Sequence, residues 1–114
     1  MDDFNYSDEF LREVAKLFKA FSQFTRLQII RELHGGPRDV SQLNEVIGGS
    51  QPNISKHLKI LKDEGIVSSK KEGNRVIYEI AREEVTMICD YVCGYMQNQL
   101  EKKMEIPDVE NRRH

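Results

Sequence analysis

The sequence has 114 residues, of which 39% are hydrophobic and 32% are charged, and its formal net charge is −2. A chain of this length has room for one domain with one modest core, and no apolar stretch approaches the roughly 18 residues needed to span a bilayer. Two cysteines and an acidic, polar start unlike a secretory signal predict a reducing, cytoplasmic setting without a disulfide framework or a membrane partner.

The first predicted helix begins after Ser7, which is expected to cap it, and continues to about Ala20. Asp8 and Glu9 fall in its first turn, where the positive end of the helix dipole favours acidic side chains. An apolar stripe along the helix predicts either core packing or contact with a partner helix, and its members are Phe10, Val14, Leu17, Phe18 and Phe21.

A second helix is expected to be capped by Ser22 and to end at Gly35-Gly36-Pro37, because glycine accepts a left-handed exit and proline cannot continue the helical hydrogen bonds. Three apolar side chains are expected to face inward, and these are Leu27, Ile30 and Leu33. Four polar side chains are expected to face outward, and these are Arg26, Gln28, Arg31 and Glu32.

A third, short helix is predicted from Asp39 and Gln42, whose three-residue spacing resembles a capping box. Its buried side is expected to consist of Val40, Leu43, Val46 and Ile47. Gly48-Gly49 should end this helix, and Ser50 should cap the next one immediately.

Residues 50–65 are predicted to form a longer helix with an apolar seam and a polar outer side. Ile54, Leu58 and Leu61 recur at spacings of four and three residues, which is the period of a buried helical face. The outward positions carry side chains that can read base edges and contact phosphates, namely Gln51, Asn53, Ser55, Lys56, His57 and Lys59. A short helix, a glycine turn and a longer helix are typical of a helix-turn-helix.

A β-hairpin is predicted directly after this helix. Residues 66–71 alternate weakly between apolar and polar, residues 75–80 alternate clearly, and Glu72-Gly73-Asn74 between them has the composition of a turn. The tip is flanked by basic side chains, namely Lys70, Lys71 and Arg75. A helix-turn-helix followed by a basic hairpin is typical of a winged helix, whose wing can contact the DNA backbone or minor groove.

The positive charge of the chain is concentrated in this region. Residues 50–75 carry six basic and three acidic groups, whereas residues 1–49 have a net charge of −2 and residues 76–114 a net charge of −3. Local charge governs phosphate contact more than the total does. The residues expected to bind DNA are therefore Ser50, Gln51, Asn53, Ser55, Lys56, His57, Lys59, Lys70, Lys71, Asn74 and Arg75.

A last helix is predicted to open at Glu83-Glu84. Its apolar residues repeat at steps of three and four, close to a heptad seam, and are Val85, Ile88, Val92, Met96, Leu100 and Met104. A long amphipathic helix beyond a complete small domain needs a covering surface, and a second copy of the chain is the simplest one. We therefore expect a homodimer formed through the first and last helices.

These elements predict a mainly α fold with a small β-hairpin, a dimeric winged helix-turn-helix of about five helices and a two-stranded wing. We expect a single DNA-binding domain over residues 1–114, with its core at about residues 8–104. Residues 1–6 and 107–114 are expected to be flexible ends.

Several segments together resemble the ArsR/SmtB family of dimeric winged-helix repressors, over about residues 9–100. The matching segments are Leu17 to Ser22 with Thr25-Arg26-Leu27, Val40 to Leu43, Ser50 to Leu58 with Leu61, Gly65-Ile66-Val67, and Gly73 to Tyr78. The resemblance implies a homodimer that binds an imperfect palindromic operator on double-stranded DNA, blocks transcription and releases the DNA when a ligand binds. Phe24 stands where the family usually has proline, and Ser22 is expected to cap the helix there.

Many members of that family sense metals or metalloids, but their usual ligand positions are not matched in this sequence. Residues 39–45, on the short helix before the turn, hold no cysteine, unlike the arsenic site. The positions of the zinc site on the last helix are occupied by Arg82, Glu84, Tyr95 and Asn98. The second helix lacks the thiol of sulfide-responsive members.

Cys89 and Cys93 lie four residues apart on the last helix. Their Cβ atoms should be about 5–6 Å apart on one face, whereas a disulfide needs roughly 3.5–4.5 Å. A thiophilic ion about 2.3 Å from each sulfur fits more easily. The pair could thus hold arsenite, cadmium or zinc as an inducer, with further ligands from a partner chain or water, or could pack as small apolar residues. No cofactor is expected to be required for folding.

Two other function classes compete with a DNA-binding repressor. A protein-interaction module with structural cysteines would have an acidic or apolar outer side on the helix of residues 50–65, whereas the basic surplus lies on this helix and the hairpin after it. A thiol redox enzyme normally places Cys-x-x-Cys at a helix start, where the dipole lowers the thiol pKa, and here the pair is mid-helix beside Asp90. We therefore predict a transcriptional regulator and not an enzyme, with a repressor that senses neither metal nor thiol chemistry as a further alternative.

Overall fold

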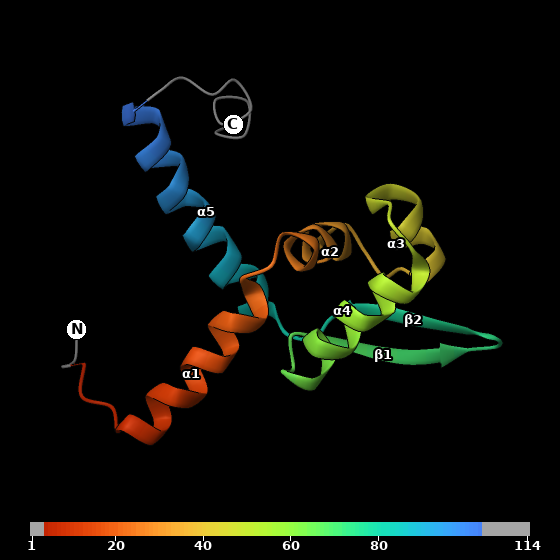
Figure 1. The fold of residues 1–114 in the computed structure, drawn as a ribbon, viewed down its shortest axis with the longest axis horizontal. Helices are drawn as coiled ribbons and strands as arrows, with labels where there is room; N and C mark the ends of the chain where they lie inside the picture. The colour runs from red at the N-terminus through yellow and green to blue at the C-terminus, as the bar shows by residue number, and fades with distance from the viewer. Residues whose placement is uncertain (1–3, 104–114) are drawn as a thin grey trace. The chain divides into compact units, whose positions relative to one another are not determined.

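The computed structural model describes residues 4–103, shown in Figure 1. The elements follow in the order α1 (Asp8–Phe21), α2 (Phe24–His34), α3 (Val40–Ile47), α4 (Gln51–Asp63), β1 (Val67–Glu72), β2 (Arg75–Ile80) and α5 (Glu83–Lys103). Five helices and a two-stranded hairpin in the described part of the chain confirm the predicted winged helix-turn-helix.

The chain forms two compact units, residues 1–81 and the segment that begins at Arg82. The single domain over residues 1–114 stays a prediction. Flexible ends were expected at residues 1–6 and 107–114, and of these, residues 1–3 and 107–114 lie outside the described residues. Met104, which was expected in the apolar seam of the last helix, also lies outside them.

Helix α1 begins as the sequence predicted, because the Ser7 Oγ atom accepts a hydrogen bond from the Phe10 backbone N–H at 3.1 Å. Its other end corrects the prediction for Ser22. The Ser22 hydroxyl and backbone N–H both donate to the Lys19 carbonyl oxygen, at 2.8 and 3.1 Å, so Ser22 closes α1. Gln23 is the N-cap residue of α2 and makes no side-chain capping bond. Only Ser22 and Gln23 separate the two helices, and Ser22 is the C-cap residue of α1.

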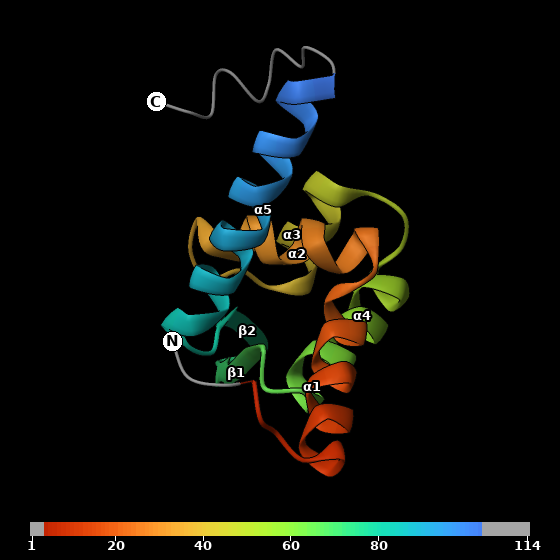
Figure 2. The same cartoon turned by 90° about the vertical axis from the view of Figure 1, so that its left-hand side faces the viewer.

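The core of the first unit lies where α2, α3, α4 and the hairpin meet, and α1 lies against α2 and α4 (Figure 2). The largest fully buried side chains are Ile29, Leu43, Ile54, Leu58, Leu61, Ile66 and Val67. Two predicted core residues are wrong, because Leu27 is 47% exposed and Val46 59% exposed. Helix α2 contacts α3, α4 and β2, so its buried side centres on Ile29, Ile30 and Leu33 and is rotated away from Leu27.

The helix-turn-helix is built from local capping, as predicted. Asp39 and Gln42 form the capping box of α3, in which the Gln42 N–H donates to Asp39 Oδ1 at 2.8 Å and the Asp39 N–H donates to Gln42 Oε1 at 2.9 Å. Gly48 and Gly49 then adopt φ values of 86° and 84°, which favour glycine. Ser50 caps α4 by accepting from the Asn53 N–H at 3.2 Å.

Strands β1 and β2 pair antiparallel from Val67 opposite Ile80 to Glu72 opposite Arg75. The two-residue loop has Gly73 at φ 62° and Asn74 at a negative φ, which is the pattern of a type II′ turn. The backbones of Arg38 and Tyr78 exchange two hydrogen bonds of 3.0 and 2.8 Å, so the segment before α3 pairs with the outer edge of β2. Sequence patterning did not predict this bridge.

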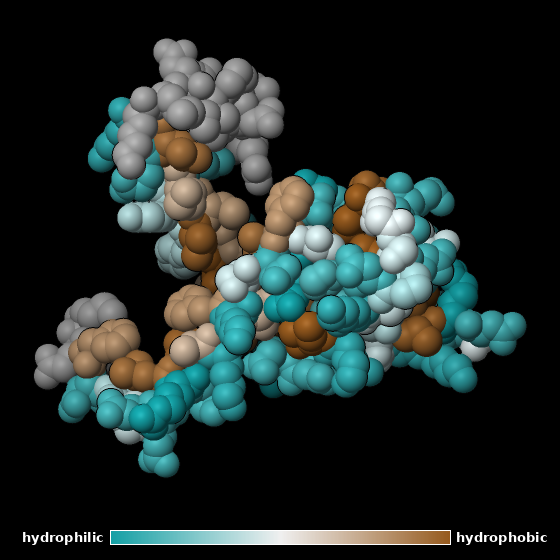
Figure 3. All heavy atoms as spheres, in the orientation of Figure 1, coloured by the Kyte–Doolittle hydropathy of each residue, from teal (hydrophilic) through white to brown (hydrophobic). Residues whose placement is uncertain are grey.

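Helix α5 runs without interruption for 21 residues, which confirms the predicted last helix. Val85 is buried, whereas several large apolar side chains are exposed, and these are Met87, Tyr91, Val92, Tyr95 and Met96. Figure 3 shows hydrophobic side chains along the length of this helix. No helix in the described residues combines the length and the apolar character needed to cross a membrane.

Candidate nucleic-acid interface

The side of α4 opposite its buried seam is polar and basic. Gln51, Asn53, Ser55, Lys56 and Lys59 are all exposed, as the helical period predicted. Lys59 Nζ lies 3.2 Å from Asp63 Oδ2 in an exposed pair four residues apart, a type of contact that is weak and easily exchanged for another anion. Within the described residues, Lys56 has no ion-pair partner. On the face drawn in Figure 3, hydrophilic residues predominate around α4 and the hairpin.

Ser50, at the start of this surface, is the N-cap residue of α4. Its hydroxyl oxygen accepts the Asn53 N–H, which fixes the first turn of α4 and the place of Gln51 and Asn53 within it. The hydroxyl group keeps its own hydrogen for a further acceptor.

His57 does not belong to this outward surface. Its side chain is only 8% exposed, and its Nδ1 atom accepts a hydrogen bond from Arg26 Nε at 3.1 Å. The Arg26 Nη1 atom donates to the Ala20 carbonyl oxygen at 3.2 Å, so one guanidinium joins the last turn of α1 to α4. The predicted outward position of His57 is wrong, and so is that of Arg26, which is half-buried. His57 lies three residues after Ile54 and four before Leu61, which places it beside the buried seam.

Burial, followed by the nearby charges of Arg26 and Lys56, lowers the pKa of His57. The neutral imidazole is the form that can accept the Arg26 hydrogen bond at Nδ1. Arg26 could have been recognised from the sequence only as a polar residue near the helix start, because its partner lies 31 residues later.

The hairpin adds a second group of polar side chains to the same unit. Lys70, Lys71 and Asn74 are exposed at and beside its tip, and Lys70 Nζ lies 3.8 Å from Glu72 Oε2. Lys62 Nζ donates to Ser69 Oγ at 2.7 Å, which connects the last turn of α4 to β1. We call the outward side of α4 together with the hairpin tip the recognition surface. Both of its parts belong to the same compact unit.

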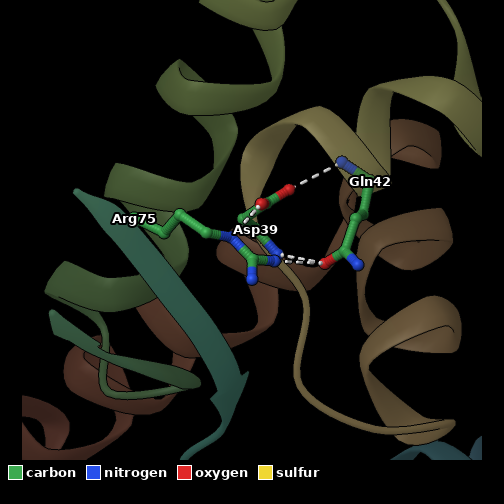
Figure 4. A network of polar contacts seen from close by, with 3 residues as sticks. All are labelled: Asp39, Gln42 and Arg75. Carbon is green, nitrogen blue, oxygen red and sulfur yellow. Dashed lines mark hydrogen bonds and ion pairs between the residues drawn. The ribbon is translucent and has the colours of Figure 1, made fainter. Parts of the chain in front are cut away.

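Arg75 points back toward the helix-turn-helix. Its Nε atom donates to Asp39 Oδ2 at 2.8 Å, and its Nη2 atom donates to Gln42 Oε1 at 3.4 Å (Figure 4). The pKa of Asp39 is lowered, first by the Gln42 backbone hydrogen bond and then by Arg75. Sequence patterning identified Asp39 and Gln42 as a cap and did not identify them as partners of the hairpin.

Cys89 and Cys93 are free thiols on α5, the first half-buried and the second exposed. Burial, the neighbouring Cys93 and the acidic Asp90 together raise the pKa of Cys89, which favours its protonated form. The described residues contain no group of three or more histidine, cysteine and acidic side chains that could hold a metal ion. The described residues therefore supply two thiols at this position and no third ligand of these types.

Comparison with known proteins identifies relatives of this chain. The family model described as bacterial regulatory protein, arsR family, matches residues 24–69, from α2 into β1. An uncharacterized HTH-type transcriptional regulator from Methanocaldococcus jannaschii is 40% identical over 81 residues, which are 70% of this chain and 91% of that protein. The HTH-type transcriptional repressor SmtB from Mycobacterium tuberculosis is 34% identical over 73 residues, which are 64% of this chain and 54% of the repressor.

A solved structure is similar over most of the chain. It is the homodimeric winged helix-turn-helix DNA-binding domain of a possible ArsR-family transcriptional regulator from Mycobacterium bovis, determined by solution NMR. It is 31% identical to this chain, has a TM-score of 0.78, and covers 91% of this chain and 99% of its own.

Proposed function

Because this chain belongs to the ArsR/SmtB family of winged helix-turn-helix transcriptional regulators, we propose that it is a homodimeric repressor that binds a palindromic DNA operator through α4 and the hairpin. The observation that supports this proposal most is the recognition surface, in which exposed polar and basic side chains of α4 stand beside a basic hairpin tip. Protein–DNA interfaces need both side-chain types, because phosphate contacts position the protein and base contacts specify the sequence.

Gln51 and Asn53 are our proposed base-reading residues. They occupy the first turn of α4, which is the part of a recognition helix that meets base edges in the major groove. Their amides match the donor and acceptor pair of adenine, and Ser55 offers a hydroxyl to either kind of base atom. The proposed phosphate contacts are Lys56, Lys59, Lys70 and Lys71, with Ser50 and Asn74 as neutral donors. His57 is left out because its imidazole is buried against Arg26.

The proposed homodimer uses α1 and α5. Both helices carry large apolar side chains in contact with water, including Phe18, which is 58% exposed, and Tyr91, which is 78% exposed. Large exposed apolar side chains that gather on the same helices are characteristic of a protein–protein interface. A two-fold dimer presents two copies of α4, so the operator should contain two half-sites about one helical turn apart.

We further propose that a thiophilic metal or metalloid ion, or a thiol-reactive compound, acts on Cys89 and Cys93 and weakens operator binding. The spacing of the two thiols on one face of α5 and the exposure of Cys93 support this step. Metal binding to thiols displaces protons, so the raised pKa of Cys89 should make the response stronger as the pH rises. The competing role, packing without sensing, is favoured by the half-buried position of Cys89.

The DNA-binding proposal is tested by selecting sequences from random double-stranded DNA with the full chain. Pseudo-palindromic selected sequences, bound by two chains, would support it. Selection of no preferred sequence, or binding by a single chain, would contradict it.

The inducer proposal is tested on the selected operator with arsenite, cadmium, zinc and a persulfide donor. Wild type should release the DNA with at least one of them, and the double variant Cys89→Ser/Cys93→Ser should not. Equal release by the double variant would remove the cysteines from the mechanism. No release of wild type by any of the four would favour a repressor in which the cysteines only pack.

A further inference from the structure

Arg75 stands at the junction of the hairpin tip and β2, where it pairs across the turn with Glu72. A basic residue there would ordinarily be assigned to DNA phosphates. Its guanidinium instead engages the start of α3, which lies 36 residues earlier in the chain. Asp39 is the more enclosed partner, with a side chain 17% exposed, against 53% for Arg75.

The contact is built into the capping box. Asp39 divides its two carboxylate oxygens, because Oδ1 accepts the Gln42 backbone N–H and Oδ2 accepts Arg75 Nε. Gln42 Oε1 likewise accepts both the Asp39 backbone N–H and Arg75 Nη2. Figure 4 shows the guanidinium meeting both side chains at the first turn of α3. The capping box of α3 is therefore also the site at which the hairpin is bound through Arg75.

The same edge of β2 is held at a second point. The residue before Asp39, Arg38, exchanges backbone hydrogen bonds with Tyr78, three residues beyond Arg75. The backbone bridge fixes the middle of β2, and the Arg75 contact fixes its end next to the tip. A free two-stranded hairpin is only marginally stable in water, so these attachments add to the burial of Val67 and Ile77 in holding the hairpin in place.

We propose that Arg75 is a positioning residue: its contact with Asp39 and Gln42 latches the hairpin to the start of α3 and so sets Lys70, Lys71 and Asn74 relative to α4. The inference rests on the proposed function, because the positioned residues are the proposed DNA contacts. With the latch closed, the tip is ordered before DNA arrives, and binding does not pay for ordering it. Phosphate is contacted by the lysines of the tip and not by Arg75.

The variant Asp39→Asn separates a latch from a simple charge effect. Asparagine caps a helix about as well as aspartate, so α3 keeps its start while the ion pair with Arg75 is lost. Removing a negative charge near DNA should by itself leave affinity unchanged or raise it. The latch predicts the opposite sign, a loss of about 3- to 10-fold in operator affinity, because the ordering cost returns. Asp63→Asn is the matched control, because the exposed Lys59–Asp63 pair joins no two elements, and it should not weaken binding.

Arg75→Gln and the double variant Asp39→Asn/Arg75→Gln complete a cycle. Each single variant and the double variant should lose affinity to a similar extent, because either change opens the same latch. Arg75→Lys keeps the charge and loses the fork geometry, so it should bind nearly as weakly as Arg75→Gln. The inference is overturned if Asp39→Asn binds as tightly as wild type or tighter, if the two losses add, or if Arg75→Lys binds like wild type.

Hydrogen exchange without DNA gives a readout that does not depend on the proposed function. Amides of the hairpin tip should exchange faster in Arg75→Gln and Asp39→Asn than in wild type, while those of the buried part of α4 stay protected. Unchanged exchange at the tip would overturn the latch even if all variants bind DNA weakly. If wild type selects no DNA at all, the proposed function fails, and exchange at the tip alone decides whether the latch exists.

Discussion

The helix-turn-helix with its hairpin and the last helix, α5, differ in how they treat their apolar residues. In the first unit, the apolar seam of α4 is fully buried and the polar side of the helix is exposed. On α5, Val85 is buried, whereas Tyr91, Val92 and Met96 are in contact with water. One chain thus completes the proposed DNA-reading surface by itself. The apolar face of α5 lacks such a cover along much of its length, and its completion by a second chain is the part that we propose.

The largest effect on stability should come from a change in the buried seam of α4. Leu58 is fully buried in α4, so Leu58→Ala should lower the free energy of unfolding by about 2–5 kcal/mol through lost burial and a residual cavity. Urea unfolding monitored by circular dichroism measures this. The exposed neighbour gives the control, since Lys59→Ala should change the free energy of unfolding by no more than about 0.5 kcal/mol. Similar losses in both variants would contradict the burial of the α4 seam.

A change in the exposed apolar seam of α5 should weaken the proposed dimer. Val92→Glu places a charge in the apolar seam of α5 and should raise the dimer dissociation constant at least about tenfold, or roughly 1.4 kcal/mol. Sedimentation measures the constant, and Asn98→Glu adds the same charge at an exposed polar position of α5 as a control. If Val92→Glu assembles like wild type, this seam is not the dimer interface.

A more local effect, confined to one operator position per half-site, is expected at the DNA. Gln51→Ala should lower discrimination between base pairs by about 1–3 kcal/mol at one operator position per half-site, because one amide reads one base. Binding to a panel of single-position operator variants measures it. A uniform loss on all sequences would mean that Gln51 only positions the helix.

The smallest effect is a pH dependence of stability in the first unit. The pKa of His57 is lowered from its ordinary value of 6.5 in the folded chain. The neutral His57 therefore makes its full contribution to the stability of the folded chain above that pH. The contribution is lost as the pH falls below it, because the unfolded chain takes up the proton first. His57→Gln, which can still accept from Arg26, should flatten this part of the profile, by an amount on the order of 1 kcal/mol or less. His34→Gln, at an exposed histidine, is the control, and equal flattening in both variants would contradict the assignment.

The same contrast explains how much the sequence could predict. The starts of α1, α3 and α4, the capping box and the glycine turn depend on side chains within three or four residues of each other, such as Asp39 and Gln42, and they were predicted correctly. The start of α2 was not, because Ser22 closes α1. The outward polar positions of α4 followed from its period, with the exception of His57. Its environment is set by Arg26, 31 residues earlier, and the direction of Arg75 is set by Asp39, 36 residues earlier. Contacts over such separations leave no local pattern.

The buried side of α2 was mispredicted for a related reason. Its apolar positions allow more than one inward direction, and packing against α3, α4 and β2 selects the one that exposes Leu27. The bridge between Arg38 and Tyr78 likewise depends on how the segment before α3 meets β2. The buried side of α2 and this bridge both depend on tertiary packing, which the spacing of apolar residues in the sequence does not specify.

The salt dependence of operator binding tests the central claim, that α4 and the hairpin hold DNA phosphates, most directly. Each phosphate contact contributes about 0.9 to the slope of log K against log salt, so Lys56→Ala and Lys71→Ala should each reduce the slope of a dimer by about 1.8. Lys102→Ala, on the exposed side of α5, should leave the slope unchanged. Slopes equal to that of wild type in both Lys56→Ala and Lys71→Ala would contradict the account.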